Sequence, residues 1–300
     1  MAGSGERRDA ALPMLTVRQA GRVRALVREA LARQGRRVTV FPGHIEDADG
    51  AKFGLGGIAR VLTARAIPEP RWGTLVDAHV ARMLSAMAGP DDFRAPTEEL
   101  LPRTYFGLYD RTALPGTGGW GYAREALPDV LEVFVLDCPD SVKTYCGDEV
   151  ARHGEHRLRA AALANARRED PGERRDFDGV HLLCSESMHF ASSALVLPEL
   201  VLKVTGEAPS ANGVLVAVPF RHQVLYSVPR DERAGRSLEA MTKIAAAEYR
   251  TGTGPISPHV FWWRDGRFTR LTEGAPGETP RLAVPAEFEA VLDSLVRNGS

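Results

Sequence analysis

The 300-residue chain has few of the features that indicate a disulfide-stapled or membrane-spanning protein. Its cysteines are Cys138, Cys146 and Cys184, an odd number that does not suit a disulfide framework and predicts a reducing compartment. No run approaches the roughly 18 consecutive apolar residues of a membrane span. Met1 to Asp9 is basic and polar, and no apolar signal core follows it. We therefore expect a cytoplasmic protein with no membrane partner.

An excess of charge is also lacking, since 38 basic and 39 acidic residues leave a formal net charge of -1. Nucleic-acid binders usually carry a basic surplus, so this balance disfavours nucleic acid as a partner. Lysine is scarce, and nearly all basic residues are arginines, a bias that with abundant Ala, Gly and Pro is typical of a high-GC actinobacterial genome. We interpret the arginines predicted on the helix after Thr16 as a solvated surface.

What is present is enough apolar sequence, 44% of the chain, to fill one large domain or two ordinary ones. Residues 1–13 are small, polar and charged, and predict a disordered tail. Prolines and glycines interrupt residues 89–128, which predicts a loop-rich connection. We therefore expect domains at 14–128 and 129–300, and an exposed linker over the charged run from Arg167 to Asp178.

Hydrophobic periodicity predicts helices and strands in mixed order, with paired strands close together in sequence. The expected helices begin after Thr16 and cover Trp72–Met87, Gly147–Gly154, His156–Arg167, Phe190–Val204, Leu238–Tyr249 and a final segment from Pro285. The expected strands cover Val38–Phe41, Ala51–Leu55, Leu131–Leu136, Val180–Cys184, Val214–Val218, Val224–Val228, His259–Trp263 and Phe268–Leu271. This order predicts an α+β fold of mostly antiparallel sheets flanked by helices.

Two local signals are specific. Pro198 lies inside the helical pattern of Phe190–Val204, which predicts either a kink or a second helix that restarts with Pro198 in its first turn. Asp265-Gly266 lies between two aromatic-rich strands, which favours a two-residue type I′ hairpin.

The most suggestive cluster for catalysis is Ser185, Glu186, Ser187 and His189, predicted where a strand meets a helix N-terminus. A nucleophilic serine needs a base and an orienting carboxylate converging on it. The G-x-S-x-G elbow is absent, and both serines are good helix caps. Ser185, Glu186 and His189 are thus candidate catalytic residues of a hydrolase, and capping is the simpler interpretation.

Two further groups are candidates for binding a partner. Arg221 and His222 are predicted at the tip of a hairpin, where they would bind an anion or a carboxylate unless they are ordinary exposed turn residues. Trp262 and Trp263 are adjacent on a predicted strand, so their side chains point to opposite faces. The outward ring is either covered by the C-terminal helix or available to a partner.

Two patterns lack the context that a cofactor or metal needs. Gly116 to Gly121 spells G-x-G-x-x-G, but it follows Leu114-Pro115 instead of a strand. Cys138, Cys146, His153 and His156 do not have the paired spacings of a structural zinc site. We therefore assign neither a cofactor nor a metal.

Three segments carry a resemblance to a known family: HLLCSESMHFASSALVLPELVLKVTGE, GVLVAVPFRHQVLYSVPRD and ISPHVFWWRDGRFTRL, all within residues 180–271. Their order resembles the bacterial family of unknown function typified by the YtpQ protein. GLGGIARVLTA and LEVFVLD are similar to its earlier half. The resemblance implies a polar strand end, a long helix, a returning strand and a closing hairpin, and it carries no catalytic residues to this chain.

The leading hypothesis is a non-catalytic factor that acts through protein–protein contacts, as an adaptor, a chaperone-like protein or an immunity-type protein. The alternative is a small-molecule hydrolase that uses the cluster from Ser185 to His189. The sequence leaves the oligomeric state open.

Overall fold

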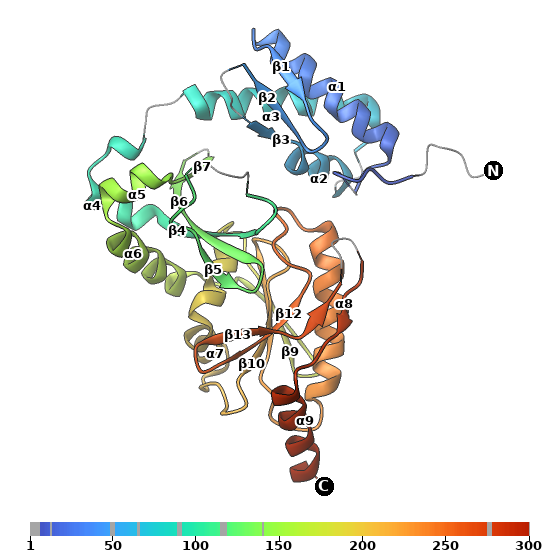
Figure 1. The fold of residues 1–300 in the computed structure, drawn as a ribbon, viewed down its shortest axis with the longest axis vertical. Helices are drawn as coiled ribbons and strands as arrows, with labels where there is room; N and C mark the ends of the chain where they lie inside the picture. The colour runs from blue at the N-terminus through green and yellow to red at the C-terminus, as the bar shows by residue number, and fades with distance from the viewer. Residues whose placement is uncertain are drawn as a thin grey trace, which may run out of the picture. The chain divides into compact units, whose positions relative to one another are not determined.

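A computed structural model describes residues 7–12, 14–48, 52–64, 67–88, 92–114, 119–139, 141–274 and 278–299. The chain divides into two compact units, one of Met1–Asp91 with Thr251–Thr253 and one of Asp92–Arg250 with Gly254–Ser300 (Figure 1). Both units combine helices with antiparallel strands, which confirms the α+β class. The boundary lies at Asp91 and not at 128, because part of the predicted connection forms strands of the second unit.

The first unit packs three helices against a small antiparallel sheet of order β1-β2-β3. Its elements are α1 (Val17–Arg33), β1 (Val38–Val40), β2 (His44–Asp47), β3 (Lys52–Gly54), α2 (Gly56–Ala64), a 3-10 turn (Glu69–Arg71) and α3 (Trp72–Ala88). Thr16 starts α1 through a capping box: its hydroxyl accepts the Gln19 N–H at 3.2 Å, and the Gln19 side chain accepts the Thr16 N–H at 3.1 Å.

The prediction of a disordered tail is wrong for residues 7–12. Leu12 is 1% exposed, and the Asp9 N–H donates to the Leu15 carbonyl at 3.0 Å. The Asp9 carboxylate accepts from Arg24 of α1 at 2.8 Å and from the Leu12 N–H at 3.0 Å. These contacts fix a segment whose composition alone indicates disorder; Met1–Glu6 and Pro13 lie outside the described residues.

The second unit contains two larger antiparallel sheets. The first comprises β4 (Thr104–Asp110), β5 (Arg124–Leu127), β6 (Val130–Cys138) and β7 (Ser141–Thr144), with β6 paired to the other three. The helical segments near it are Asp92–Arg94, α4 (Thr97–Leu100), Leu101–Arg103, α5 (Gly147–His153) and α6 (Glu155–Arg168).

The second sheet of this unit has the order β13-β12-β10-β11-β9-β8 and is covered on both faces. Its strands are β8 (Glu173–Phe177), β9 (Val180–Cys184), β10 (Val214–Ala217), β11 (Gln223–Ser227), β12 (Val260–Arg264) and β13 (Arg267–Arg270). One face packs against a 3-10 helix (Phe190–Val196) and α7 (Leu197–Thr205), and the other against α8 (Ala234–Thr251) and α9 (Ala286–Gly299). The short strands β14 (Thr272–Glu273) and β15 (Arg281–Leu282) pair separately.

The structure decides the local predictions. Pro198 stands in the first turn of α7, which restarts the chain after the 3-10 helix. Asp265 and Gly266 have φ of 50° and 78°, the positive values that a type I′ turn requires at both central positions. The predicted linker from Arg167 to Asp178 is wrong, because α6 continues to Arg168 and Glu173–Phe177 forms the edge strand β8.

Candidate functional site

The segment from Ser185 to Ser187 follows β9, as predicted, and its hydroxyls bind its own backbone. The Ser185 Oγ accepts the N–H of Ser187 at 3.2 Å, and the Ser187 Oγ accepts the N–H of His189 at 3.2 Å. The Ser185 N–H donates to the His222 carbonyl at 3.0 Å. Both serines thus stabilise the turn that leads into the 3-10 helix.

The His189 ring is buried, and its described contacts are to Tyr105 and Asp137 and not to these hydroxyls. It is 6% exposed and stacks on Tyr105 of β4, with ring centroids 4.2 Å apart. Its Nε2 lies 3.3 Å from Asp137 Oδ1 of β6, but the geometry makes no hydrogen bond. Among the described contacts the imidazole therefore has a carboxylate neighbour and no serine hydroxyl, which does not form the nucleophile–base pair that the hydrolase prediction needs.

Arg221 and His222 lie between β10 and β11, as predicted, yet both are half-buried and are not at an exposed tip. The Arg221 carbonyl accepts the Ala191 N–H at 3.0 Å, and the His222 Nδ1 lies 3.1 Å from the Ser185 carbonyl oxygen. Because a carbonyl only accepts, Nδ1 carries the proton. Burial lowers the pKa of Arg221, and burial followed by the Arg221 charge lowers the pKa of His222. Anion binding by this pair stays a prediction.

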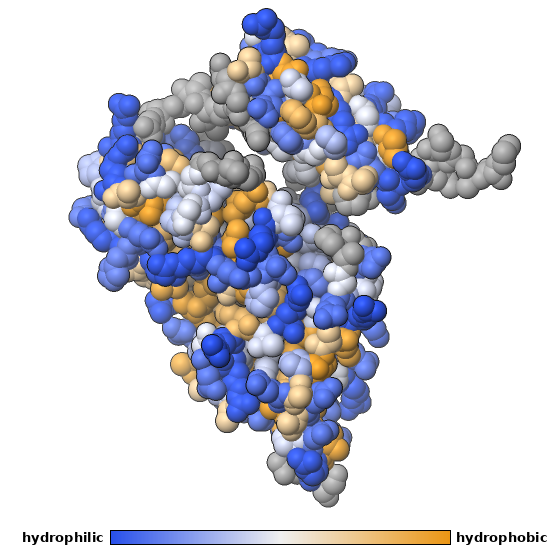
Figure 2. Space-filling view, viewed as in Figure 1, coloured by the Kyte–Doolittle hydropathy of each residue, from blue (hydrophilic) through white to orange (hydrophobic). Residues whose placement is uncertain are grey.

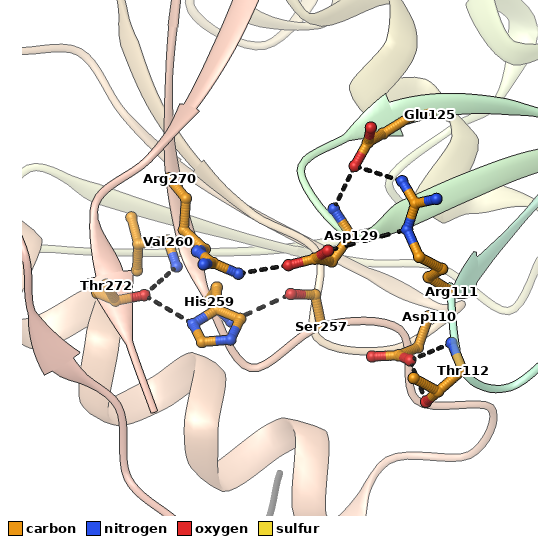
Figure 3. Close-up of polar contacts among 10 residues, drawn as sticks. All are labelled: Asp110, Arg111, Thr112, Glu125, Asp129, Ser257, His259, Val260, Arg270 and Thr272. Atoms are coloured by element: carbon orange, nitrogen blue, oxygen red, sulfur yellow. Dashed lines mark hydrogen bonds and ion pairs between the residues drawn. The ribbon is translucent and has the colours of Figure 1, made fainter. Parts of the chain in front are cut away.

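Figure 3 shows a polar cluster that the sequence did not indicate, at the turn between β5 and β6. Asp129 lies between two guanidinium groups, with Arg270 Nη1 of β13 at 2.6 Å and Arg111 Nε at 3.9 Å. Arg111 also pairs with Glu125 at 2.8 Å. Asp129 has a φ of 64° after Pro128, a turn position that usually takes glycine or asparagine. An aspartate there is the only sequence signal of this cluster.

His259 lies beside the Asp129–Arg270 pair and is half-buried (Figure 3). Its Nδ1 is 3.1 Å from Thr272 Oγ1, and its backbone N–H donates to Ser257 Oγ at 3.3 Å. Burial and then Arg270 lower the pKa of His259, while Asp129 and Asp110 oppose that change. The charges of this cluster join the β5–β6 turn to β13, and the serine contacts the backbone of the histidine instead of its ring.

Two of the residues considered for zinc, Cys146 and His153, are engaged elsewhere. Cys146 caps α5, and both ring nitrogens of His153 have partners, Thr97 Oγ1 at 2.9 Å and the Phe93 carbonyl at 2.8 Å. The described residues contain no group of three or more His, Cys, Asp or Glu side chains that could hold a metal ion. Of the G-x-G-x-x-G pattern, residues 116–118 lie outside the described part of the chain.

The aromatic residues of the β12–β13 hairpin face both sides of a covered sheet. Trp262 is 3% exposed and packs on Phe288 of α9, with centroids 5.0 Å apart. Its Nε1 donates to the Asn212 carbonyl at 2.8 Å. Trp263 and Phe268 pack partly buried against the core of the opposite face. The C-terminal helix thus covers Trp262, which leaves that residue almost no surface for a partner.

Exposed apolar side chains occur instead at the end of β1 in the first unit. Val40 is 36% exposed and Phe41 37% exposed, and the Phe41 ring stacks on His44 at 4.6 Å. A shallow hollow of about 400 Å³ is lined by Asp9, Ala10, Ala11, Arg24, Val40, Phe41 and Pro42. Figure 2 shows hydrophobic residues interspersed with hydrophilic ones over α1 and β1.

Comparisons with protein-family models, curated proteins and solved structures found no match for this chain. The resemblance to the YtpQ family therefore stays a prediction that rests on the quoted segments. In the described part of the chain no helix has the length and apolar content needed to cross a bilayer.

Proposed function

We propose that the protein is a non-catalytic cytoplasmic factor that acts by binding another protein, in an adaptor, chaperone-like or immunity-type role. The observation that carries the proposal is the exposed Val40–Phe41 pair beside the hollow of the first unit. The free thiols of Cys138, Cys146 and Cys184 agree with a reducing compartment.

The chemistry of the Val40–Phe41 surface suits protein contact. Burying apolar surface that is in contact with water gains about 25 cal/mol of free energy per Å². Aromatic side chains in depressions are common anchors of protein interfaces. The polar clusters of the second unit, in contrast, direct their hydroxyls and charges to contacts within the chain. Those contacts support the interaction hypothesis over the hydrolase hypothesis.

The test is affinity purification of the tagged protein from its host, followed by measurement of the dissociation constant for the purified partner. Phe41→Asp should weaken the complex at least about tenfold, since it puts a charge where an apolar ring would be buried. Leu202→Asp is the matched control, because Leu202 is 50% exposed on α7 of the second unit. Circular dichroism should show both variants folded. Equal affinity of the two variants would overturn the proposal.

The hydrolase alternative has its own test. Ser185→Ala, Glu186→Ala and His189→Ala would each abolish turnover of a substrate if the cluster were catalytic. Folded variants that retain every cellular activity of the protein would remove that alternative.

A further inference from the structure

One edge of β1 is not paired with a strand in the described part of the first unit. The strand order β1-β2-β3 places β2 on one side of β1, and nothing described lies hydrogen bonded on the other. The Phe41 N–H donates to the His44 carbonyl at 2.8 Å, and the Ala48 N–H donates to the Arg37 carbonyl at 3.2 Å. The residues that hydrogen bond to β2 are therefore the odd-numbered ones: Thr39 within β1, and Arg37 and Phe41 on either side of it.

Because hydrogen-bonded and non-hydrogen-bonded pairs alternate in an antiparallel ladder, Val38 and Val40 direct their N–H and C=O groups away from β2. Two residues with the same outward orientation present two donors and two acceptors at the spacing of an extended chain. Such an edge fits another strand and does not fit a helix.

The two side-chain faces of this edge differ in chemistry. Val38 and Val40 lie on the face that carries Ile45, which is fully buried. Arg37 precedes β1 on the opposite face, is exposed, and forms no ion pair with a described side chain. A strand added here would place apolar side chains beside Val38 and Val40 and would meet a positive charge on its other face.

Helix α1 adds further positive charge beside β1. The Arg24 guanidinium donates to the Pro42 carbonyl at 2.6 Å, which places this face of α1 beside the end of β1. Arg28 is exposed and lies one turn farther along the same face. Asp9 neutralises Arg24 at 2.8 Å, whereas Arg28 has no described ion pair. Helix α1 thus brings its positive charge to the Val38–Val40 face, while Arg37 carries the positive charge of the opposite face.

We propose that the partner binds by adding an extended segment of alternating acidic and apolar residues to the open edge of β1. The proposal rests on the proposed function and specifies its partner. Backbone hydrogen bonds to Val38 and Val40 supply affinity, and acidic side chains on the Arg37 face of the added strand select the sequence.

The test uses the full chain and an end-blocked peptide of alternating Glu and Val. On binding, the amide signals of Val38 and Val40 should shift in NMR spectra and become protected from hydrogen exchange, while the amide of Thr39, already paired with Glu46, stays as it is. A Lys–Val peptide should bind at least about tenfold more weakly. Backbone N-methylation of the Glu–Val peptide should remove binding.

Charge reversal supplies the matched variants. Arg37→Glu should weaken Glu–Val binding about tenfold and reverse the preference towards the Lys–Val peptide. Lys243→Glu makes the same change in net charge on an exposed position of α8 and should leave binding unchanged. Equal effects of the two variants, equal binding of the two peptides, or tighter binding of a single-stranded oligonucleotide that displaces the peptide would overturn the proposal.

The failure of this inference is distinguishable from the failure of the proposed function. If Phe41→Asp abolishes capture of the cellular partner but Glu–Val peptides do not protect Val38 and Val40, strand addition is wrong and the interaction role stands. If Phe41→Asp leaves capture of the partner intact, the proposed function is wrong. Strand addition is then wrong as well, because it specifies how that partner binds.

Discussion

Truncation of Trp262 is the sharpest test of which aromatic residues support the fold. The ring is 3% exposed against Phe288, and its Nε1 donates to the Asn212 carbonyl at 2.8 Å. Removing a buried aromatic side chain costs about 3–5 kcal/mol, and the half-buried Asn212 carbonyl loses its donor as well. Trp262→Ala should therefore lower the free energy of unfolding of the second unit by about 4 kcal/mol or more, a large part of the 5–15 kcal/mol of a typical domain.

The assay is urea unfolding followed by far-ultraviolet circular dichroism. Trp262→Phe keeps most of the packing and loses the Nε1 donor, so its cost should be about 1–3 kcal/mol. Trp263→Ala is the neighbouring control and should cost less than Trp262→Ala, because Trp263 is only partly buried. A cost under about 1 kcal/mol for Trp262→Ala, together with loss of the cellular partner, would refute the assignment of this ring to the core.

Three further predictions concern the polar cluster and the turns. Asp129→Ala should lower the free energy of unfolding by about 1–2 kcal/mol in urea titrations, because it loses the ion pair with Arg270 and keeps a side chain at positive φ. Asp129→Gly should be near neutral, because glycine adopts positive φ without strain and this gain offsets the lost ion pair. Folding lowers the pKa of His222 and His259, so the unfolded chain binds more protons below the ordinary histidine pKa of 6.5. The melting temperature should thus be highest above that pH and fall as the pH drops towards 5. In His259→Gln the melting temperature should fall less over the same pH range. Gly213→Ala should lower the melting temperature strongly, since φ is +79° and a Cβ would lie 2.3 Å from the Trp263 carbonyl oxygen.

The sequence predicted the parts of the fold that local chemistry determines. Asp265-Gly266 is almost sufficient to define its hairpin, because few residues tolerate positive φ at both positions. Pro198 likewise has to begin a helix or break one. The alternation of Val214 and Val216 with their return strand indicated β10 and β11 without any tertiary information.

The missed elements depend on contacts between distant residues. β8 is highly charged because it is an edge strand with exposed side chains, so its composition resembles a linker. The segment from Arg7 to Leu12 is ordered by the Asp9–Arg24 pair, the buried Leu12 side chain and backbone bonds to residues that follow it in the chain. In the cluster around Asp129, the partner Arg270 of β13 lies 141 positions farther along the chain. No local sequence pattern predicts a pair at that separation.

The arrangement of the larger sheet has a consequence for how the protein is made. β10 and β11 are wholly buried strands at the centre of the sheet, and their neighbour β12 comes after α8 in the chain. Phe288, Val291 and Leu295 of α9 complete the core over Trp262. During synthesis the apolar central strands thus leave the ribosome before β12 and α9, which cover them. The apolar surface of the second unit therefore stays partly exposed until those segments have been made. The elements α1 to α3 of the first unit are close together in sequence and have no such delay.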